Sequence, residues 1–174
     1  MTATRSAILD MQAEGDRKEI ARATEAAALA EESPTVLATL VAALFHDDPA
    51  TVSHAAHALM TLAKDHAPLL DPHREALARA YGLDQWEVKE QMAKILPQLG
   101  FRRSEQGRLM EEFDETLRHH KSGIARTCAL QAMVDMAALD PTHTEAALSA
   151  LDYAMRKGSK ALQARARKLA GTLS

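Results

Sequence analysis

Two stretches of the sequence decide the fold: residues 48–63, DPATVSHAAHALMTLA, and residues 84–99, DQWEVKEQMAKILPQL. In each stretch an aspartate comes four residues before a valine, and apolar side chains then recur three and four positions apart. Side chains at that spacing lie on one face of an α-helix, whereas a half-buried strand would alternate apolar and polar residues. Each stretch therefore predicts a helix with one buried face.

The same apolar pattern returns twice more at a nearly constant interval. The leading residues Val52, Val88, Ala125 and Leu162 are spaced 36, 37 and 37 residues apart. Four further columns fall into line at these offsets: Ala56, Met92, Ala129 and Ala166; Leu59, Ile95, Ala132 and Leu169; Met60, Leu96, Met133 and Ala170; Ala63, Leu99, Met136 and Leu173. Agreement of several columns at one interval is typical of a helical repeat protein.

Short polar residues mark the expected helix starts. Four of them stand directly before a proline: Ser33, Asp48, Asp71 and Asp140. A side-chain oxygen there can accept an unpaired backbone N–H, and proline suits the first helical position because no donor is needed at that point. Ser122 and Ser159 are the candidate caps of the later copies, and Pro97 is expected to end its helix before Gly100.

The composition favours an all-α fold. The 174 residues are 47% hydrophobic but only 3% aromatic, and alanine dominates the apolar set. Alanine is the strongest helix former, whereas strands prefer β-branched and aromatic residues. No apolar run approaches the roughly 18 residues that span a bilayer. Residues 1–16 meet acids before any signal-like apolar core, and Cys128 is the single cysteine, so we expect a cytoplasmic protein.

The pattern Asp-x-x-x-Val, followed by a basic residue and then by alanine, resembles the second helix of a HEAT repeat. It is clearest in residues 48–63 and 84–99, and looser in SGIARTCALQAMVDMA (122–137) and KALQARARKLAGTL (160–173). The resemblance implies a right-handed α-α superhelix, or solenoid, of about four to five helical hairpins. In such an array neighbouring hairpins share one core, because no hairpin can bury its own apolar face.

The resemblance covers nearly the whole chain, so we expect residues 1–174 to form a single repeat domain. Asp16 stands four residues before Ile20, which indicates a shortened first copy. The approximate repeats are 1–32, 33–66, 67–100, 101–139 and 140–174.

The HEAT resemblance places a binding surface on the concave side, which the second helices of that family line. The position after each leading residue is often basic in the family, and here it holds Ser53, Lys89, Arg126 and Gln163. The residues predicted to contact a partner are His54, His57, Trp86, Lys89, Lys94, Arg126, Gln163 and Arg167. Trp86 has two interpretations, as a partly exposed anchor for the partner or as a packing contact with Tyr81.

No pattern of residues indicates catalysis, a metal site or a cofactor. His46-Asp47 is reminiscent of HD-type phosphohydrolases, but those enzymes need a histidine further upstream and none precedes His46. His54 and His57 supply only two of the three or four ligands that zinc requires. Cys128 has no Cys-x-x-Cys partner and is expected to be a small buried thiol.

The acidic side chains near residue 115 also have an ordinary interpretation. Glu111, Glu112 and Glu115 precede His119, but the Glu-x-x-His spacing of di-iron helices is absent. They are expected to form a solvated helix face. The seven glycines are spread over the chain and form no phosphate-binding loop.

Charge leaves two classes of partner open. The net charge is −3, but residues 156–174 carry six basic residues and no acid. That edge is either a solubilising cap of the last repeat or part of a phosphate-attracting stripe. We therefore expect a monomeric, non-catalytic adaptor that binds another protein. The alternative is a nucleic-acid-binding protein related to the HEAT-like alkylpurine DNA glycosylases, and the phycobilin-lyase HEAT-like group ranks third.

Overall fold

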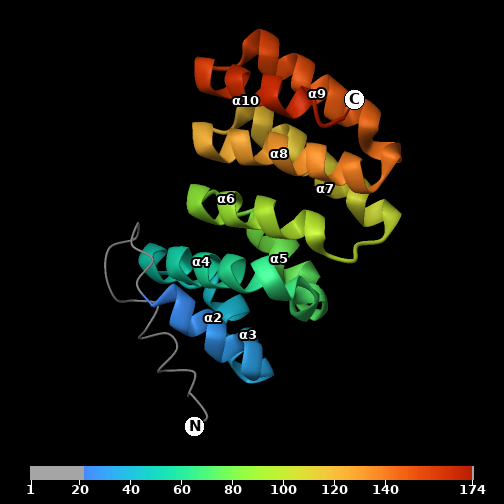
Figure 1. Ribbon diagram of the computed structural model, residues 1–174. Coiled ribbons are helices and arrows are strands. Elements are labelled where there is room, and N and C mark those ends of the chain that lie inside the picture. Colours follow the sequence, from blue (N-terminus) through green and yellow to red (C-terminus); the bar gives the residue numbers. More distant parts are fainter. Residues whose placement is uncertain (1–21, 174) are drawn as a thin grey trace. The chain divides into compact units, whose positions relative to one another are not determined.

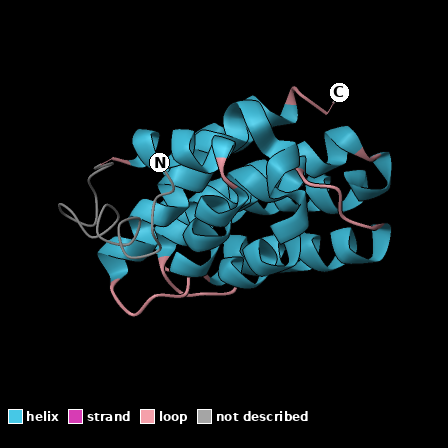
Figure 2. Cartoon of the chain, turned by 90° about the horizontal axis from the view of Figure 1, so that it is seen from below, coloured by secondary structure: helices cyan, strands magenta, loops and turns pink. Residues whose placement is uncertain are grey.

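The computed structural model describes residues 22–173, so the shortened copy expected around Asp16 and Ile20 lies outside the described residues. Within the described range every regular element is a helix, as predicted, and no strand occurs (Figure 2). The chain divides into two compact units, one ending at Gly100 and one beginning at Phe101. This boundary coincides with the predicted limit between two repeats, and the single repeat domain stays a prediction.

The unit that ends at Gly100 is built around α4, the longest of its described helices (Figure 1). α4 packs against α2, α3 and α6, and α5 packs against α6. The elements are α2 (Ala23–Glu32), α3 (Pro34–Ala43), α4 (Pro49–His66), the 3-10 helix η1 (Ala67–His73), α5 (Arg74–Tyr81), α6 (Trp86–Ile95) and the 3-10 turn η2 (Leu96–Gln98).

The unit that begins at Phe101 consists of two helical hairpins, α7–α8 and α9–α10 (Figure 1). α8 packs against α7, α9 and α10, and α9 also contacts α7. The elements are α7 (Arg103–His119), α8 (Gly123–Leu139), the 3-10 turn η3 (Pro141–His143), α9 (Thr144–Lys157) and α10 (Lys160–Ala170).

The columns predicted from the repeat interval belong to the core. All members of the first three columns, which begin with Val52, Ala56 and Leu59, are buried. In the other two columns only Met60, Ala170 and Leu173 are half-buried. Burial of apolar side chains contributes roughly 25 cal/mol per Å², so these columns contribute to the stability of both units.

Most of the predicted caps are present. The side chains of Ser33 and Asp48 accept the backbone N–H groups of Val36 and Thr51 at 3.4 and 2.9 Å. Ser122 and Ser159 cap α8 and α10 in the same way, each with an acceptor distance of 3.3 Å. The Asp140 carboxylate accepts the N–H of Thr142 and begins the turn η3 rather than α9 itself.

The cap predicted at Asp71 is wrong. Asp71 lies inside η1, and its carboxylate accepts the backbone N–H of Gly100 at 2.8 Å. A partner 29 residues away has therefore displaced the local one, and the bond ties η1 to the end of this unit. Pro97 behaves as predicted, because α6 ends at Ile95 and Pro97 lies in η2.

Candidate functional site

In three of the four copies, the residue after the leading position forms a hydrogen bond inside its hairpin. The Lys89 Nζ donates to the Tyr81 carbonyl at 2.8 Å, and the Arg126 Nε donates to the Leu117 carbonyl at 2.7 Å. In the last hairpin, the Gln163 side-chain amide donates to the Gly158 carbonyl at 3.0 Å. Each bond connects the second helix to the C-terminal end of the first.

These bonds satisfy carbonyl groups that the helix itself leaves without a donor. The last carbonyls of an α-helix have no intrahelical partner, and cationic groups are favourable at that end. The Lys89 ammonium also lies 4.5 Å from the centre of the Tyr81 ring, within cation–π range. Lys89, Arg126 and Gln163, predicted as partner contacts, therefore hold the two helices of their hairpins together.

His54 and Ser53 do not belong to an exposed face. Both side chains are buried, as is the whole stretch from Thr51 to Ala56. The prediction of an exposed His54 is wrong because α4 contacts helices on three sides, α2, α3 and α6. An amphipathic pattern predicts one buried face and gives no sign of a helix enclosed by several neighbours.

The remaining predicted contacts on α4 and α6 lie closer to solvent. His57 is half-buried, and burial lowers the pKa of its imidazole, an effect opposed by the negative charge of Glu90 and reinforced by Lys94. The Lys94 ammonium pairs with the Glu90 carboxylate at 2.8 Å on the same helix. Trp86 is half-buried at the first position of α6. These residues remain candidate partner contacts.

Several guanidinium groups of the basic C-terminal edge contact polar or acidic side chains of the same unit. Arg156 pairs with Asp152 at 2.9 Å, and Arg165 donates to the side chain of Gln131 on α8. Arg167 is exposed and lies 3.5 Å from the side-chain oxygen of Gln163. The pairing of these guanidinium groups favours the interpretation of this edge as a polar outer surface.

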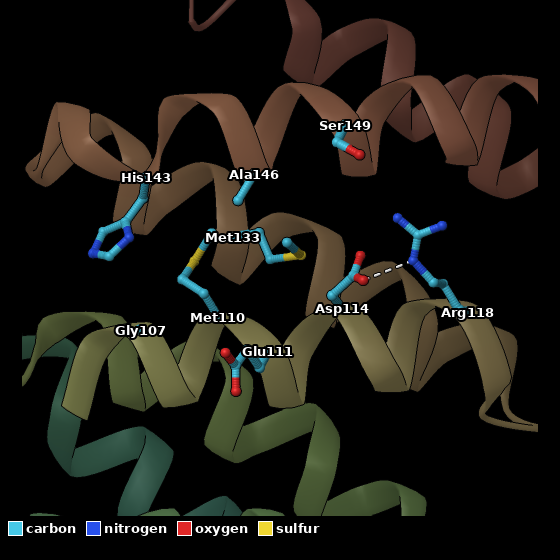
Figure 3. A pocket seen from close by; sticks show the side chains of 9 residues that line it. All are labelled: Gly107, Met110, Glu111, Asp114, Arg118, Met133, His143, Ala146 and Ser149. Atoms are coloured by element: carbon cyan, nitrogen blue, oxygen red, sulfur yellow. Dashed lines mark hydrogen bonds and ion pairs between the residues drawn. The ribbon is translucent and has the colours of Figure 1, made fainter. Parts of the chain in front are cut away.

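A groove between α7 and α9 was not predicted from the sequence. Its volume is about 370 Å³. Figure 3 shows Met110 and Met133 at its centre, His143 at one end, and Arg118 at the other. The nine lining residues are Gly107, Met110, Glu111, Asp114, Arg118, Met133, His143, Ala146 and Ser149. All belong to the unit that begins at Phe101.

Both ends of the groove are held by side-chain contacts. The Arg118 Nε donates to the Asp114 carboxylate at 2.7 Å, and this bond raises the pKa of the guanidinium. The Arg118 guanidinium also lies 4.4 Å from the centre of the Tyr153 ring on α9. At the opposite end the His143 Nε2 lies 3.1 Å from the Gln106 side-chain oxygen. The groove is therefore a preformed feature of the hairpins.

Glu111 gives the groove an unbalanced negative charge. It is exposed, and within residues 22–173 no basic side chain forms an ion pair with it. Asp114, the other lining carboxylate, is compensated by Arg118. Glu111 therefore places an acid beside an apolar, methionine-containing floor, which suits a ligand that combines apolar and cationic groups.

The only local signal for the groove is the small size of three residues. Gly107 on α7 and Ala146 and Ser149 on α9 leave space where larger side chains would fill the gap between the helices. Glu111 was assigned to a solvated helix face, and its exposure is consistent with that prediction. A carboxylate on a solvated face and one at the edge of a groove look alike in sequence.

In the part of the chain that the structure describes, no group of three His, Cys, Asp or Glu side chains is arranged to hold a metal ion. In the same range, no helix has the length and apolar character needed to cross a membrane. Cys128 is half-buried within α8. No match was found among protein-family models, curated proteins or solved structures.

Proposed function

We propose that the chain is a non-catalytic interaction module, a HEAT-like solenoid that binds a segment of another protein. The groove between α7 and α9 is the observation that carries this proposal. The recurrence of buried columns and of the hydrogen bond made by Lys89, Arg126 and Gln163 supports the HEAT-like part.

The size and lining of the groove favour a protein segment as the ligand. Small-molecule pockets occupy roughly 300–1,000 Å³ and enclose most of the ligand, so a volume of about 370 Å³ is at the low end. Glu111, Ala146 and Ser149 are all exposed, so the groove is open along one side. An open apolar groove accepts side chains from a helix or extended segment that lies across it.

The groove, rather than the second-helix face, is the better contact surface. Three of the predicted second-helix contacts already bond within their hairpins, and His54 is buried. At the groove, Glu111 offers a carboxylate to a lysine or arginine of the partner, and Met110 and Met133 adapt to an apolar side chain. We therefore expect the bound segment to carry both kinds of residue.

The test fills the groove without disturbing the core. Ala146 is exposed, so Ala146→Trp occupies the groove from its rim. Ala164→Trp is the matched control, because Ala164 is also exposed and lies on α10 of the same unit. Lysate with and without nuclease treatment is passed over the wild type and both variants, and the retained protein is then purified and titrated against each by calorimetry.

We expect Ala146→Trp to weaken binding at least about tenfold, since a hot-spot contact contributes about 2 kcal/mol or more. Ala164→Trp should bind like the wild type. Equal binding by both variants would contradict the groove as the site. Retention that disappears on nuclease treatment and falls steeply with salt would instead favour the nucleic-acid alternative.

A further inference from the structure

The groove between α7 and α9 runs along both of its walls (Figure 3). The α7 wall has a lining residue at every turn: Gly107, Met110, Glu111, Asp114 and Arg118. Side chains three or four positions apart lie on one face of a helix, so this wall extends for about 16 Å, or three turns. The lining residues of the other wall, His143, Ala146 and Ser149, are three positions apart. The groove is therefore shaped like the space beside two aligned helices.

Small side chains line much of both walls. Gly107, Ala146 and Ser149 present at most a methyl or hydroxymethyl group to the groove, and Ala146 and Ser149 are exposed. Packed helices have axes about 8–10 Å apart, depending on the side chains at the contact. The small residues therefore leave room for the backbone of a third helix to lie close to α7 and α9.

Other common modes of peptide binding lack their structural requirements at this groove. An extended peptide that adds to a sheet needs a strand edge, and every regular element within residues 22–173 is a helix. Proline-rich segments dock in aromatic-lined grooves, and no Phe, Trp or Tyr is among the nine described lining residues. A helix forms its own backbone hydrogen bonds, so it needs none from the groove.

The chemistry of the lining specifies two side chains of such a helix. Met110 and Met133 lie at the centre of the groove, where their flexible side chains can adjust to an apolar group. Glu111 is the exposed lining carboxylate that Arg118 does not compensate, so it favours a cation. Residues three or four positions apart are neighbours on a helix surface. One helix can therefore present both groups.

We propose that the groove binds an amphipathic helix of a partner protein, in which a lysine or arginine lies one turn from a large apolar residue. The inference rests on the function proposed above and selects a helix over an extended segment. The apolar residue lies over Met110 and Met133, and the basic residue pairs with Glu111. The bound helix lies along α7 and α9 as a third helix.

The test selects ligands from random peptides displayed on phage, each about 16 residues or about four helical turns long. The immobilised full chain is the bait. Clones are kept when they bind the wild type and Ala164→Trp but not Ala146→Trp. We expect the retained peptides to share a basic residue three or four positions from a large apolar residue, and to lack internal proline.

Proline substitution tests the conformation of the best retained peptide. Proline at a central position that does not face the groove should weaken binding at least about tenfold, because it breaks a helix. Retained peptides that tolerate this substitution, or that share no basic residue, would overturn the helix inference and leave the groove as the binding site. A selection in which every binder also binds Ala146→Trp would contradict the groove itself. A selection without any binder would overturn the helix inference, and the lysate experiment would still decide the groove.

The contact with Glu111 is tested on the same peptide by calorimetry. Glu111→Gln should weaken binding about threefold to fivefold, as expected for an exposed ion pair. Glu115→Gln is the matched control, because Glu115 is also exposed on α7 but does not line the groove, and it should change the affinity by less than about twofold. Glu111→Lys should prefer a peptide whose basic residue is replaced by glutamate. Equal losses in Glu111→Gln and Glu115→Gln would contradict the pairing.

Discussion

The hairpins α5–α6 and α7–α8 belong to different units, yet each closes its turn with the same kind of hydrogen bond. Lys89 donates to Tyr81 in the first, and Arg126 donates to Leu117 in the second. Other features of the two hairpins differ. One core column holds the large Ile95 in α6 and a small alanine in α8, and a serine caps α8 whereas no side chain caps α6.

The comparison distinguishes the feature that both hairpins share from the features that differ between them. Both hairpins keep a donor that reaches back to the end of the first helix. The volume of a core position and the presence of a side-chain cap vary between them. The donor is therefore the feature that these two hairpins share, whereas core volume is adjusted locally by the neighbouring side chains.

The largest effect is expected from core volume. Ile95→Ala should lower the free energy of unfolding by about 2–5 kcal/mol, because it removes three carbon atoms from a fully buried position. In the matched column, Ala132→Ile should cost about 1–3 kcal/mol through overpacking. Urea unfolding followed by circular dichroism measures both. A cost below about 1 kcal/mol for Ile95→Ala would show that the column is not a tightly packed core.

Removing the hairpin donors should have an intermediate effect. Lys89→Met and Arg126→Met keep most of the aliphatic side chain but leave a helix-end carbonyl without its donor. We expect each to cost about 1–2 kcal/mol, since both side chains are half-buried and charge-assisted bonds are weaker near solvent. The same unfolding measurement applies.

Lys94→Met is the matched control for the donors. Lys94 makes only an exposed pair with Glu90, so its loss should change stability by less than about 0.5 kcal/mol. Equal costs for Lys89→Met and Lys94→Met would contradict a structural role for the donor position. Charge reversal at Lys89 or Arg126 is expected to destabilise the hairpin, so it is a poor probe of partner binding.

The smallest effect on stability is expected from removing the helix caps. The contribution of the Asp48 cap should depend on pH, whereas that of the Ser122 cap should not. Asp48→Ala and Ser122→Ala should each cost about 0.5–1 kcal/mol at pH 7. Hydrogen bonds from the Thr51 hydroxyl and then the Thr51 N–H lower the pKa of Asp48. Its contribution is therefore present above the usual carboxyl pKa of about 4 and is lost as pH falls through the lower folded value.

Ser122 does not titrate in this range, so the cost of Ser122→Ala should be the same at pH 7 and about pH 3. Unfolding free energies of the wild type and both variants at the two pH values provide the comparison. A cost for Asp48→Ala that is unchanged at the lower pH would mean that the carboxylate charge contributes nothing to the cap.

The helices and the core could be predicted from the sequence because both depend on local regularities. The repeat interval identified the buried columns, and Ser33, Asp48, Ser122 and Ser159 act as caps within three residues of their donors. The cap prediction at Asp71 was wrong because its carboxylate accepts a hydrogen bond from Gly100, which is 29 residues away. A cap prediction is correct only when no distant donor competes for the carboxylate.

The candidate site was harder to predict because it depends on how helices pack side by side. The charges of Lys89 and Arg126 favoured the prediction that both residues contact a partner. In the structure, the turn of each hairpin brings a carbonyl at the end of the preceding helix within hydrogen-bond distance of the side chain. The groove depends on the small Gly107, Ala146 and Ser149 meeting across two helices. Neither arrangement leaves a periodic signal along the sequence.

The donor bond also limits how these hairpins can be re-engineered. The loops between paired helices shorten along the chain, from 82–85 to 120–122 to 158–159. The shortest loop contains Gly158, where an added Cβ would clash with the Ala154 carbonyl oxygen. The donor beside this loop is the short side chain of Gln163. Longer loops are spanned by the longer side chains of Lys89 and Arg126. A designer who shortens or lengthens one of these connections must therefore change the reach of the donor side chain at the same time.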